Sequence, residues 1–228
     1  MNILVLDYET FYDVGFSLTK MSTAAYVNDD QFAVWGVGIK WNDEPTEWIS
    51  PDDIPHMFEQ IPWDDTALVC HNTLFDAYIM TQIHKVKPAY YYDTAAMSRG
   101  LYPNESASLK DVCKRLFPDD KTMRKGDELV TAKGIRDLDP ELEKVIAGYC
   151  IQDVDLTNAI FHKMVKNFPT SELNLIDITV RMFVEPKLVL DRELLIAHKE
   201  QIATETAQKI AASGTDRETL ASQPKFAA

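Results

Sequence analysis

The sequence lacks the clustered cysteines and histidines that form zinc sites. Its 228 residues include three cysteines, and no two of them form a CxxC pair. Because Cys70, Cys113 and Cys150 are far apart and odd in number, they do not indicate a disulfide framework. We expect them to be reduced, buried and structural, in a cytoplasmic protein, or in the host cytoplasm if the protein is viral.

Long hydrophobic runs are also missing. No apolar stretch approaches the roughly 20 residues that span a bilayer. We expect no signal peptide, because the first predicted strand begins next to Met1. The sequence has no low-complexity tract and no evident internal repeat. We therefore expect no membrane partner, and we expect the protein to be a monomer.

Positive charge is scarce. The sequence has 23 lysines and arginines against 36 aspartates and glutamates, which gives a formal net charge of −13. This balance argues against non-specific nucleic-acid binding, which uses a basic surface. It does not exclude an enzyme that acts on phosphates, because acids that bind divalent cations reverse the local charge. Hydrophobic residues make up 46% of the chain, which is enough for a packed core.

Predicted strands and helices alternate along the chain, which indicates an α/β fold. The apolar pattern predicts strands at residues 2–7, 32–41, 46–49, 66–70 and 89–92. It predicts helices at 52–61, 71–85, 108–117, 139–168, 171–183 and 191–212, with a polar loop over 118–138. The short turn between the second and third strands favours an antiparallel hairpin. We expect a compact domain over 1–168 and a helical extension over 169–228.

The triplet D-x-E occurs four times, starting at Asp7, Asp139, Asp191 and Asp216. The last three triplets begin predicted helices, where acids cap the helix and favour its dipole. Only Asp7 follows a predicted buried strand. Residues i and i+2 of a strand point to the same face, so Asp7 and Glu9 project together. The alternative is a solvated strand end with two incidental acids.

A second polar group, His71 to Asp76, lies where a predicted strand leads into a helix. Asn72 and Asp76 are four residues apart, and we expect them on one helical face. The ends of neighbouring strands are where open α/β sheets form their sites. In the alternative, Asn72 caps the helix and Asp76 only interacts favourably with the helix dipole.

The predicted helix 139–168 carries an acid on its apolar stripe. Asp153 falls on the core-facing side, where an unpaired carboxylate is costly, so we expect a cation to meet it. Tyr149 lies one turn earlier, and its hydroxyl can share that environment. The alternative is a helix that frays near residue 150 and exposes Asp153; we expect Asp155, on another face, to be solvated. The stripe consists of Leu142, Ile146, Tyr149, Asp153, Leu156, Ile160 and Met164.

These acids suggest a single metal centre if they converge in space. Four carboxylates packed together repel and raise one another's pKa. Two divalent ions about 3.5–4 Å apart remove this repulsion, and hard oxygen ligands suit Mg²⁺ or Mn²⁺ rather than zinc. Such a pair supports in-line phosphoryl chemistry, in which one ion activates water and the other stabilises the leaving 3′ oxygen. We therefore interpret the acids as metal ligands.

Three short motifs follow one another along the chain: Asp7-Tyr8-Glu9-Thr10, Asn72-Thr73-Leu74-Phe75-Asp76 and Tyr149-Cys150-Ile151-Gln152-Asp153. In order and separation they resemble the DEDD-type 3′–5′ exonucleases of the ribonuclease-H-like superfamily, over about residues 1–168. One branch of this family has a histidine five residues before the last aspartate, where this sequence has Gly148. The other branch has a tyrosine four residues before it, as here. The sequence thus resembles the tyrosine branch, which includes proofreading domains of DNA polymerases.

The resemblance implies a fold and an activity. The fold is a ribonuclease-H-like mixed sheet of about five strands flanked by helices, with a C-terminal helical extension. The activity is the two-metal-ion removal of nucleotides from the 3′ end of single-stranded DNA, as proofreading during replication. The tail, with ITVRMF and EPKLVLD, resembles the connection into the polymerase part of phage-type family A enzymes, so we expect a polymerase domain C-terminal to this chain.

Two other functions remain open at this point. An exoribonuclease of the same branch would use identical chemistry, and the choice would depend on the space around the 2′-hydroxyl, which the sequence does not reveal. A non-catalytic nucleic-acid-binding module of the same fold would show the loss of one or more acids, and none is lost here.

The resemblance also assigns roles to the acids and the tyrosine. Asp7 would bridge both metal ions, Glu9 and Asp153 would hold the tighter ion, and Asp76 would help to hold the second. Tyr149 would orient the attacking nucleophile.

Further residues are expected to contact the substrate. The resemblance places Thr10 and Asn72 against the terminal nucleotide. The family has an aromatic wedge, for which Phe11, Tyr12 and Phe75 are candidates, although a core position is favoured for Phe75.

The loop over 118–138 is basic in part, with Lys121, Arg124, Lys125 and Lys133. These residues would either guide single-stranded DNA or belong to a solvated loop, and we favour the solvated loop. We interpret Asp93 as a helix cap and His71 as structural support for the second motif.

Overall fold

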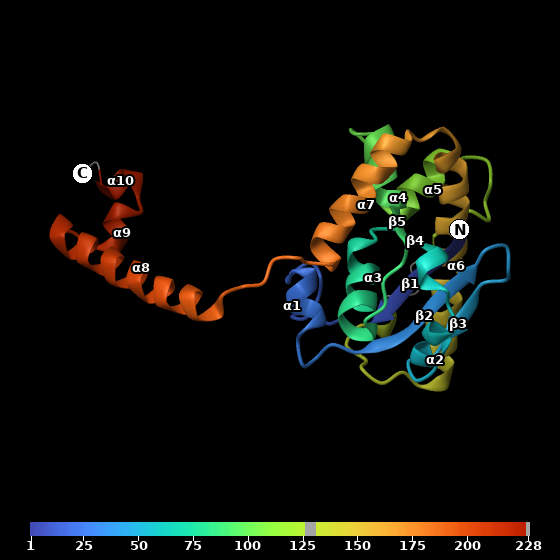
Figure 1. Cartoon of the computed structure of the whole chain (residues 1–228), viewed down its shortest axis with the longest axis horizontal. Helices are drawn as coiled ribbons and strands as arrows, with labels where there is room; N and C mark the ends of the chain where they lie inside the picture. The colour runs from blue at the N-terminus through green and yellow to red at the C-terminus, as the bar shows by residue number, and fades with distance from the viewer. Residues whose placement is uncertain (126–130, 227–228) are drawn as a thin grey trace. The chain divides into compact units, whose positions relative to one another are not determined.

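The computed structural model describes residues 1–125 and 131–226, and the chain forms two compact units (Figure 1). The first unit is Met1–Pro186, and the second begins at Lys187. The first unit contains a five-stranded sheet flanked by helices, as the sequence predicts. None of the helices in the described part of the chain combines the length and the apolar character needed to cross a membrane.

The sheet has the strand order β3-β2-β1-β4-β5. Its strands are β1 (Asn2–Thr10), β2 (Val34–Trp41), β3 (Glu47–Ile49), β4 (Thr66–Cys70) and β5 (Tyr90–Asp93). β1 pairs antiparallel with β2, and β2 pairs antiparallel with β3, so the predicted hairpin is confirmed. β1, β4 and β5 run parallel, so their carboxyl ends meet at one edge of the sheet.

The central strand β1 is covered on both faces, which explains its continuous apolar run. Leu6 and Tyr8 belong to the same core cluster as residues of α3 (Leu74–Ile79). Val5 belongs to a second cluster on the opposite face. That cluster includes residues of α4 (Thr94–Leu101), α5 (Leu109–Leu116) and the long helix α6 (Pro140–Met164). The sheet thus lies between α3 on one face and α6 on the other.

Helix caps account for the three D-x-E triplets that were not expected to form a site. Asp139, Asp191 and Asp216 are the N-caps of α6, α8 (Arg192–Ser213) and α9 (Arg217–Leu220). Each carboxylate accepts a hydrogen bond from a backbone N–H of the first turn. The capping interpretation is therefore confirmed for all three.

Two features near the N-terminus differ from the prediction. β1 continues to Thr10 instead of ending at residue 7, because β2 pairs with it from Leu4 to Thr10, with a register shift between Glu9 and Thr10. The short helix α1 (Thr23–Val27) is absent from the predicted elements, because its five residues are too few to show a periodic pattern. Helix α2 (Ile54–Glu59) falls inside its predicted range.

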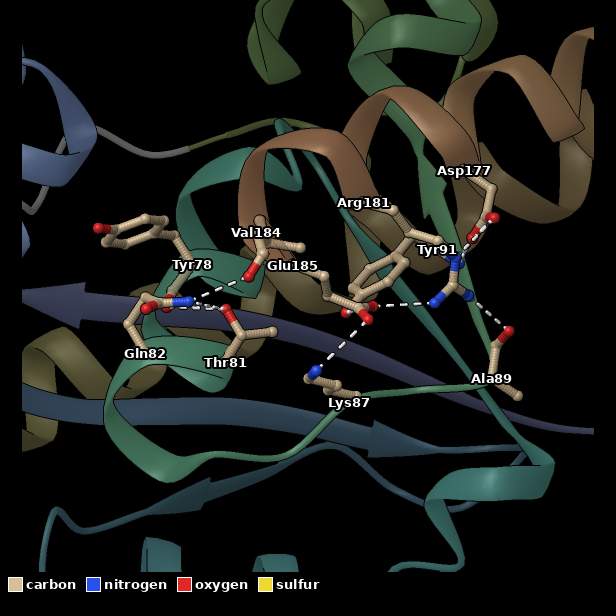
Figure 2. A network of polar contacts seen from close by, with 10 residues as sticks. All are labelled: Tyr78, Thr81, Gln82, Lys87, Ala89, Tyr91, Asp177, Arg181, Val184 and Glu185. Carbon is tan, nitrogen blue, oxygen red and sulfur yellow. Dashed lines mark hydrogen bonds and ion pairs between the residues drawn. The ribbon is translucent and has the colours of Figure 1, made fainter. Parts of the chain in front are cut away.

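Helix α7 (Thr170–Val184) covers the outer edge of β5 with polar side chains (Figure 2). The Tyr91 N–H donates to Asp177 Oδ1 at 2.9 Å, and Arg181 donates to the carbonyl of Ala89 at 2.7 Å. Arg181 also bonds Asp177 at 2.8 Å and Glu185 at 2.9 Å. The side chains of α7 thus satisfy backbone groups that an edge strand would otherwise leave open.

The compact unit therefore extends beyond residue 168, where the sequence analysis places the start of the extension. Leu173, Val180 and Val184 of α7 are buried, and the Gln82 amide donates to the carbonyl of Val184 at 3.0 Å. This packing joins α7 to the first unit up to Pro186. The functional division of the chain at 168 remains a prediction.

The second unit is helical. It consists of α8, α9 and α10 (Gln223–Phe226), and α8 has no buried residue. The predicted break over 185–191 is confirmed, because no helix or strand covers these residues. Gly214 caps the C-terminal end of α8, and its φ of 71° is the left-handed conformation that favours glycine at this position.

Candidate active site

Asp7 and Glu9 lie in β1 and point to the face that α6 covers. Asp7 pairs with Gly38 of β2, and Glu9 pairs with Gly36. A Cβ atom at Gly38 would lie 2.8 Å from the Cys150 Sγ atom, so the absence of a side chain there lets α6 approach the strand. Asp7 is half-buried and Glu9 is buried, which excludes the alternative of a solvated strand end.

The side chain of Asp153 on α6 is buried, as the apolar stripe predicts. Only 3% of its surface is exposed, so the alternative of a frayed helix is wrong. The expected cation is Lys125, whose ammonium group contacts Asp153 Oδ2. The same ammonium lies 4.6 Å from the centre of the Tyr149 ring. Tyr149 is one turn before Asp153 and is buried on the same face of α6.

Asp76 approaches the same strand from the other side. β4 pairs with β1 only as far as Val5, where the chain turns toward α3. The Tyr8 N–H, beyond this point, donates to Asp76 Oδ1 at 3.0 Å. Asp76 therefore takes over the backbone pairing that β4 no longer provides, and the fold fixes its carboxylate beside β1.

The four acids interact electrostatically. Burial and the charge of Asp153 raise the pKa of Asp7 from 3.8 to about 7. Burial, and then the charge of Asp7, raise the pKa values of Glu9 and Asp76 well above their usual range. Burial and the charge of Asp153 also raise the pKa of Tyr149, so its hydroxyl keeps its proton at neutral pH. In the protein without a metal ion, these carboxylates disfavour one another's ionisation.

Cys150 is a member of this group that the sequence analysis treats only as structural. One ligand atom from each of Asp7, Glu9 and Cys150 lies within 4.8 Å of the others. The Cys150 thiol donates to the carbonyl of Asp7 at 3.2 Å, and burial raises its pKa. Cys150 therefore remains a thiol and supports β1, whereas metal-binding cysteines are thiolates. The sequence feature that could have indicated its place beside the acids is its position within the third motif.

The remaining donors suit a hard divalent cation. Asp7, Glu9, Asp76 and Asp153 offer carboxylate oxygens, which are the ligands that Mg²⁺ and Mn²⁺ prefer. The raised pKa values of Asp7, Glu9 and Asp76 indicate that positive charge is needed when all of the acids are ionised. The residues present therefore fit such ions.

A cavity of about 310 Å³ lies beside Glu9 and Thr10. Its walls include Tyr8, Tyr12 and Phe75. The Thr10 hydroxyl forms a 2.9 Å hydrogen bond with the hydroxyl of Tyr26, another residue of the wall. Of the three candidates for an aromatic wedge, Phe11 and Phe75 belong to the buried core, and Tyr12 is partly buried.

Asn72 lies elsewhere, and its expected helical position is wrong. α3 begins at Leu74, and Asn72 precedes it with a φ of 77°, so Asn72 and Asp76 do not share a helical face. The reason is Asp93, which accepts the N–H groups of Asn72 and Thr73 at 3.1 and 3.2 Å. Asp93 is also the N-cap of α4, as predicted. A capping residue that holds a second loop is not recognisable from sequence alone.

The neighbouring polar residues have structural roles. His71 contacts Thr94 Oγ1 and the carbonyl of Ala107, both at 2.8 Å, which confirms its supporting role. In the loop, Arg124 donates to the carbonyl of Pro118 at 2.8 Å, and Lys125 contacts Asp153, so these two residues are not simply solvated. The part of the loop at 126–130 lies outside the described residues.

Comparison with known proteins gives one family match. The family model DNA_pol_A_exo1, described as 3′-5′ exonuclease, matches residues 48–169. This is more than half of the chain and includes the second and third motifs. A search of curated proteins finds no match.

Solved structures share the fold at low sequence identity. Trypanosoma brucei RNase D is 17% identical with a TM-score of 0.62, over 83% of this chain and 68% of that chain. A structure of the same enzyme in complex with RNA U12 is 15% identical with a TM-score of 0.58, over 83% and 66%. Brucella melitensis NrnC with bound Mg²⁺ is 12% identical with a TM-score of 0.51, over 80% and 82%.

Proposed function

Because the chain belongs to the 3′-5′ exonuclease family, we propose that it hydrolyses single-stranded DNA from the 3′ end with two divalent metal ions. The observation that carries this proposal is the convergence of four carboxylates from β1, α3 and α6 around one strand. By the family resemblance, Asp7 would hold both ions, Glu9 and Asp153 one of them, and Asp76 the other. The ions would supply an activated water and a stabilised leaving oxygen.

The residues around the acids would position the substrate and the water. The Tyr149 hydroxyl keeps its proton and can orient a water molecule, but it cannot act as a base at neutral pH. The cavity beside Thr10 has an aromatic wall that can stack on the terminal base. We propose that this cavity receives the terminal nucleotide, and that Tyr12, the least buried of the aromatic candidates, contacts it.

We further propose that the natural role is proofreading, with a polymerase domain C-terminal to this chain. The family model that matches is named for DNA polymerases, and the tail over 169–228 resembles the connection into a polymerase. The second candidate substrate is RNA, because T. brucei RNase D, one of the similar structures, is also found in complex with RNA U12.

Digestion of matched DNA and RNA oligonucleotides tests the substrate. Both carry a label at the 5′ end and are incubated with and without Mg²⁺. We expect the labelled DNA to shorten from its 3′ end in single steps, only with Mg²⁺, and faster than the RNA. If RNA is digested faster than DNA, RNA is the substrate. If neither is digested with Mg²⁺ or Mn²⁺, the proposed activity is refuted.

Magnesium should stabilise the protein more at pH 8 than at pH 5.5. The pKa of Asp7 is raised on folding, so its contribution to stability is complete below pH 3.8 and is lost as the pH rises through about 7. Above that value the ionised carboxylates bind the cation, which adds about 2.7 kcal/mol at 100 times the dissociation constant. For a chain of this length we expect thermal unfolding to shift upward by about 5–10 °C at pH 8.

Differential scanning fluorimetry measures this shift. Asp7→Asn removes a proposed ligand and should show little shift at either pH. An equal shift in the variant and the wild type, or a larger shift at pH 5.5, would contradict a metal centre at these acids.

A further inference from the structure

Two further cavities are lined in part by residues of the second motif. Their volumes are about 480 and 290 Å³, and Asn72 and Arg99 line both of them. Phe75, three residues after Asn72, lines the cavity beside Glu9, and its N–H donates to the carbonyl of Asn72 at 3.2 Å. The short segment 72–75 therefore contributes to the walls of the proposed terminal-nucleotide cavity and of these two cavities.

Arg99 differs from every other arginine of the first unit. It is exposed on α4 and makes no hydrogen bond or ion pair with any residue in the ranges 1–125 and 131–226. Each of the other four donates to a backbone carbonyl. These are Arg115 to Ser106, Arg124 to Pro118, Arg136 to Gln31 and Arg181 to Ala89.

The acids that line these cavities do not neutralise Arg99. Glu105 forms its ion pair with Arg115, at 3.5 Å. Asp93 accepts four backbone N–H groups, two from the loop at 72–73 and two from the start of α4. In a chain with a net charge of −13, an arginine that is open to solvent at a cavity is a suitable site for an anion.

We propose that Arg99 binds a backbone phosphate of the single-stranded nucleic acid on the 5′ side of the scissile bond. This inference rests on the proposed function, which places the terminal nucleotide in the cavity that Phe75 of the same segment lines. The strand must leave that cavity, and its next phosphates need positive charge in an otherwise acidic surface. The cavity of about 480 Å³ beside Arg99 offers the space for them.

The test compares a long substrate with one that has no neighbouring phosphate. The long substrate is a 5′-labelled oligothymidylate of about 12 nucleotides, and the short one is the p-nitrophenyl ester of thymidine 5′-phosphate. For Arg99→Ala we expect the KM of the oligonucleotide to rise about tenfold with kcat unchanged, because one charge-assisted contact is lost. The short ester should be hydrolysed as by the wild type. In a plot of the logarithm of the oligonucleotide binding constant against log[salt], the slope should become less steep by about 0.7, the contribution of one phosphate contact.

Two further variants make the result specific. Arg99→Lys keeps the charge, so the salt slope should be retained while KM rises less than in Arg99→Ala. The control is Lys85→Gln, which removes one positive charge before β5, at the amino ends of the parallel strands. It should leave both substrates unaffected. Unchanged oligonucleotide kinetics in Arg99→Ala, or an equal loss with the short ester, would overturn the proposal.

Binding can be measured apart from hydrolysis. Fluorescence anisotropy of the same oligothymidylate in Ca²⁺ should show about tenfold weaker binding to Arg99→Ala. If the wild type hydrolyses neither substrate, the proposed function fails, and the anisotropy result still decides the role of Arg99. Equal binding by the wild type and Arg99→Ala would refute that role.

Discussion

Asp7→Asn should lower the rate of nucleotide release by at least about 10³-fold and should also stabilise the metal-free protein at pH 8. The loss of activity follows because asparagine cannot supply the charge that holds two cations. The gain in stability follows because burial and the charge of Asp153 disfavour the ionised form of Asp7 and raise its pKa to about 7. Removing the charge should contribute about 2–4 kcal/mol at pH 8.

Two measurements check this prediction. Release of labelled nucleotide gives the rate, and thermal unfolding in EDTA gives the stability. The matched control is Asp155→Asn on the same helix, because Asp155 is exposed, accepts a hydrogen bond from Thr46 at 2.5 Å and pairs with Lys40 at 3.6 Å. Asp155→Asn should retain full activity. Activity of Asp7→Asn above one tenth of the wild type would contradict the assignment.

A chain that ends at residue 168 should fail to fold, whereas one that ends at 186 should fold. Loss of α7 removes the buried side chains of Leu173, Val180 and Val184 and exposes the apolar surface that they cover, at about 2 kcal/mol for each side chain. It also removes Asp177 and Arg181, which satisfy the backbone at the edge of β5. The total is comparable to the 5–15 kcal/mol by which domains are stable.

Circular dichroism and size-exclusion chromatography distinguish these outcomes. The chain 1–168 should show no cooperative unfolding or should aggregate through the open edge of β5. The chain 1–186 should unfold cooperatively and hydrolyse DNA, because α8, which it lacks, buries no residue. A cooperative unfolding transition for 1–168, at a midpoint within a few degrees of that for 1–186, would show that α7 is an appendage.

Local chemistry in the sequence was sufficient for much of the site. Asp153 interrupts an apolar stripe, and a buried acid needs a cation, which is what Lys125 provides. Capping patterns likewise distinguished Asp139 and Asp191, which begin helices, from Asp7, which belongs to the site. These inferences depend on residues within one or two turns of each other, where spacing determines direction.

The features that the sequence did not reveal depend on contacts between distant segments. Asp93 caps α4 and also holds the backbone of Asn72, which moves Asn72 out of the helix that spacing predicts. The bonds from Arg181 to Ala89 and from Lys125 to Asp153 join residues 92 and 28 positions apart. Neither periodicity nor composition encodes such pairs, because they arise only when the chain has folded.

Gly38 determines how closely α6, which carries Asp153, approaches the sheet that carries Asp7, although it has no functional side chain itself. An added methyl group would meet Cys150 at 2.8 Å and Val154 at 3.0 Å, so the helix would have to retreat from the sheet. The separation between Asp7 and Asp153 is thus decided at a position that takes no part in the chemistry. Substitution at Gly38 is therefore restricted as firmly as substitution of the charged residues, because this position has no room for a Cβ atom.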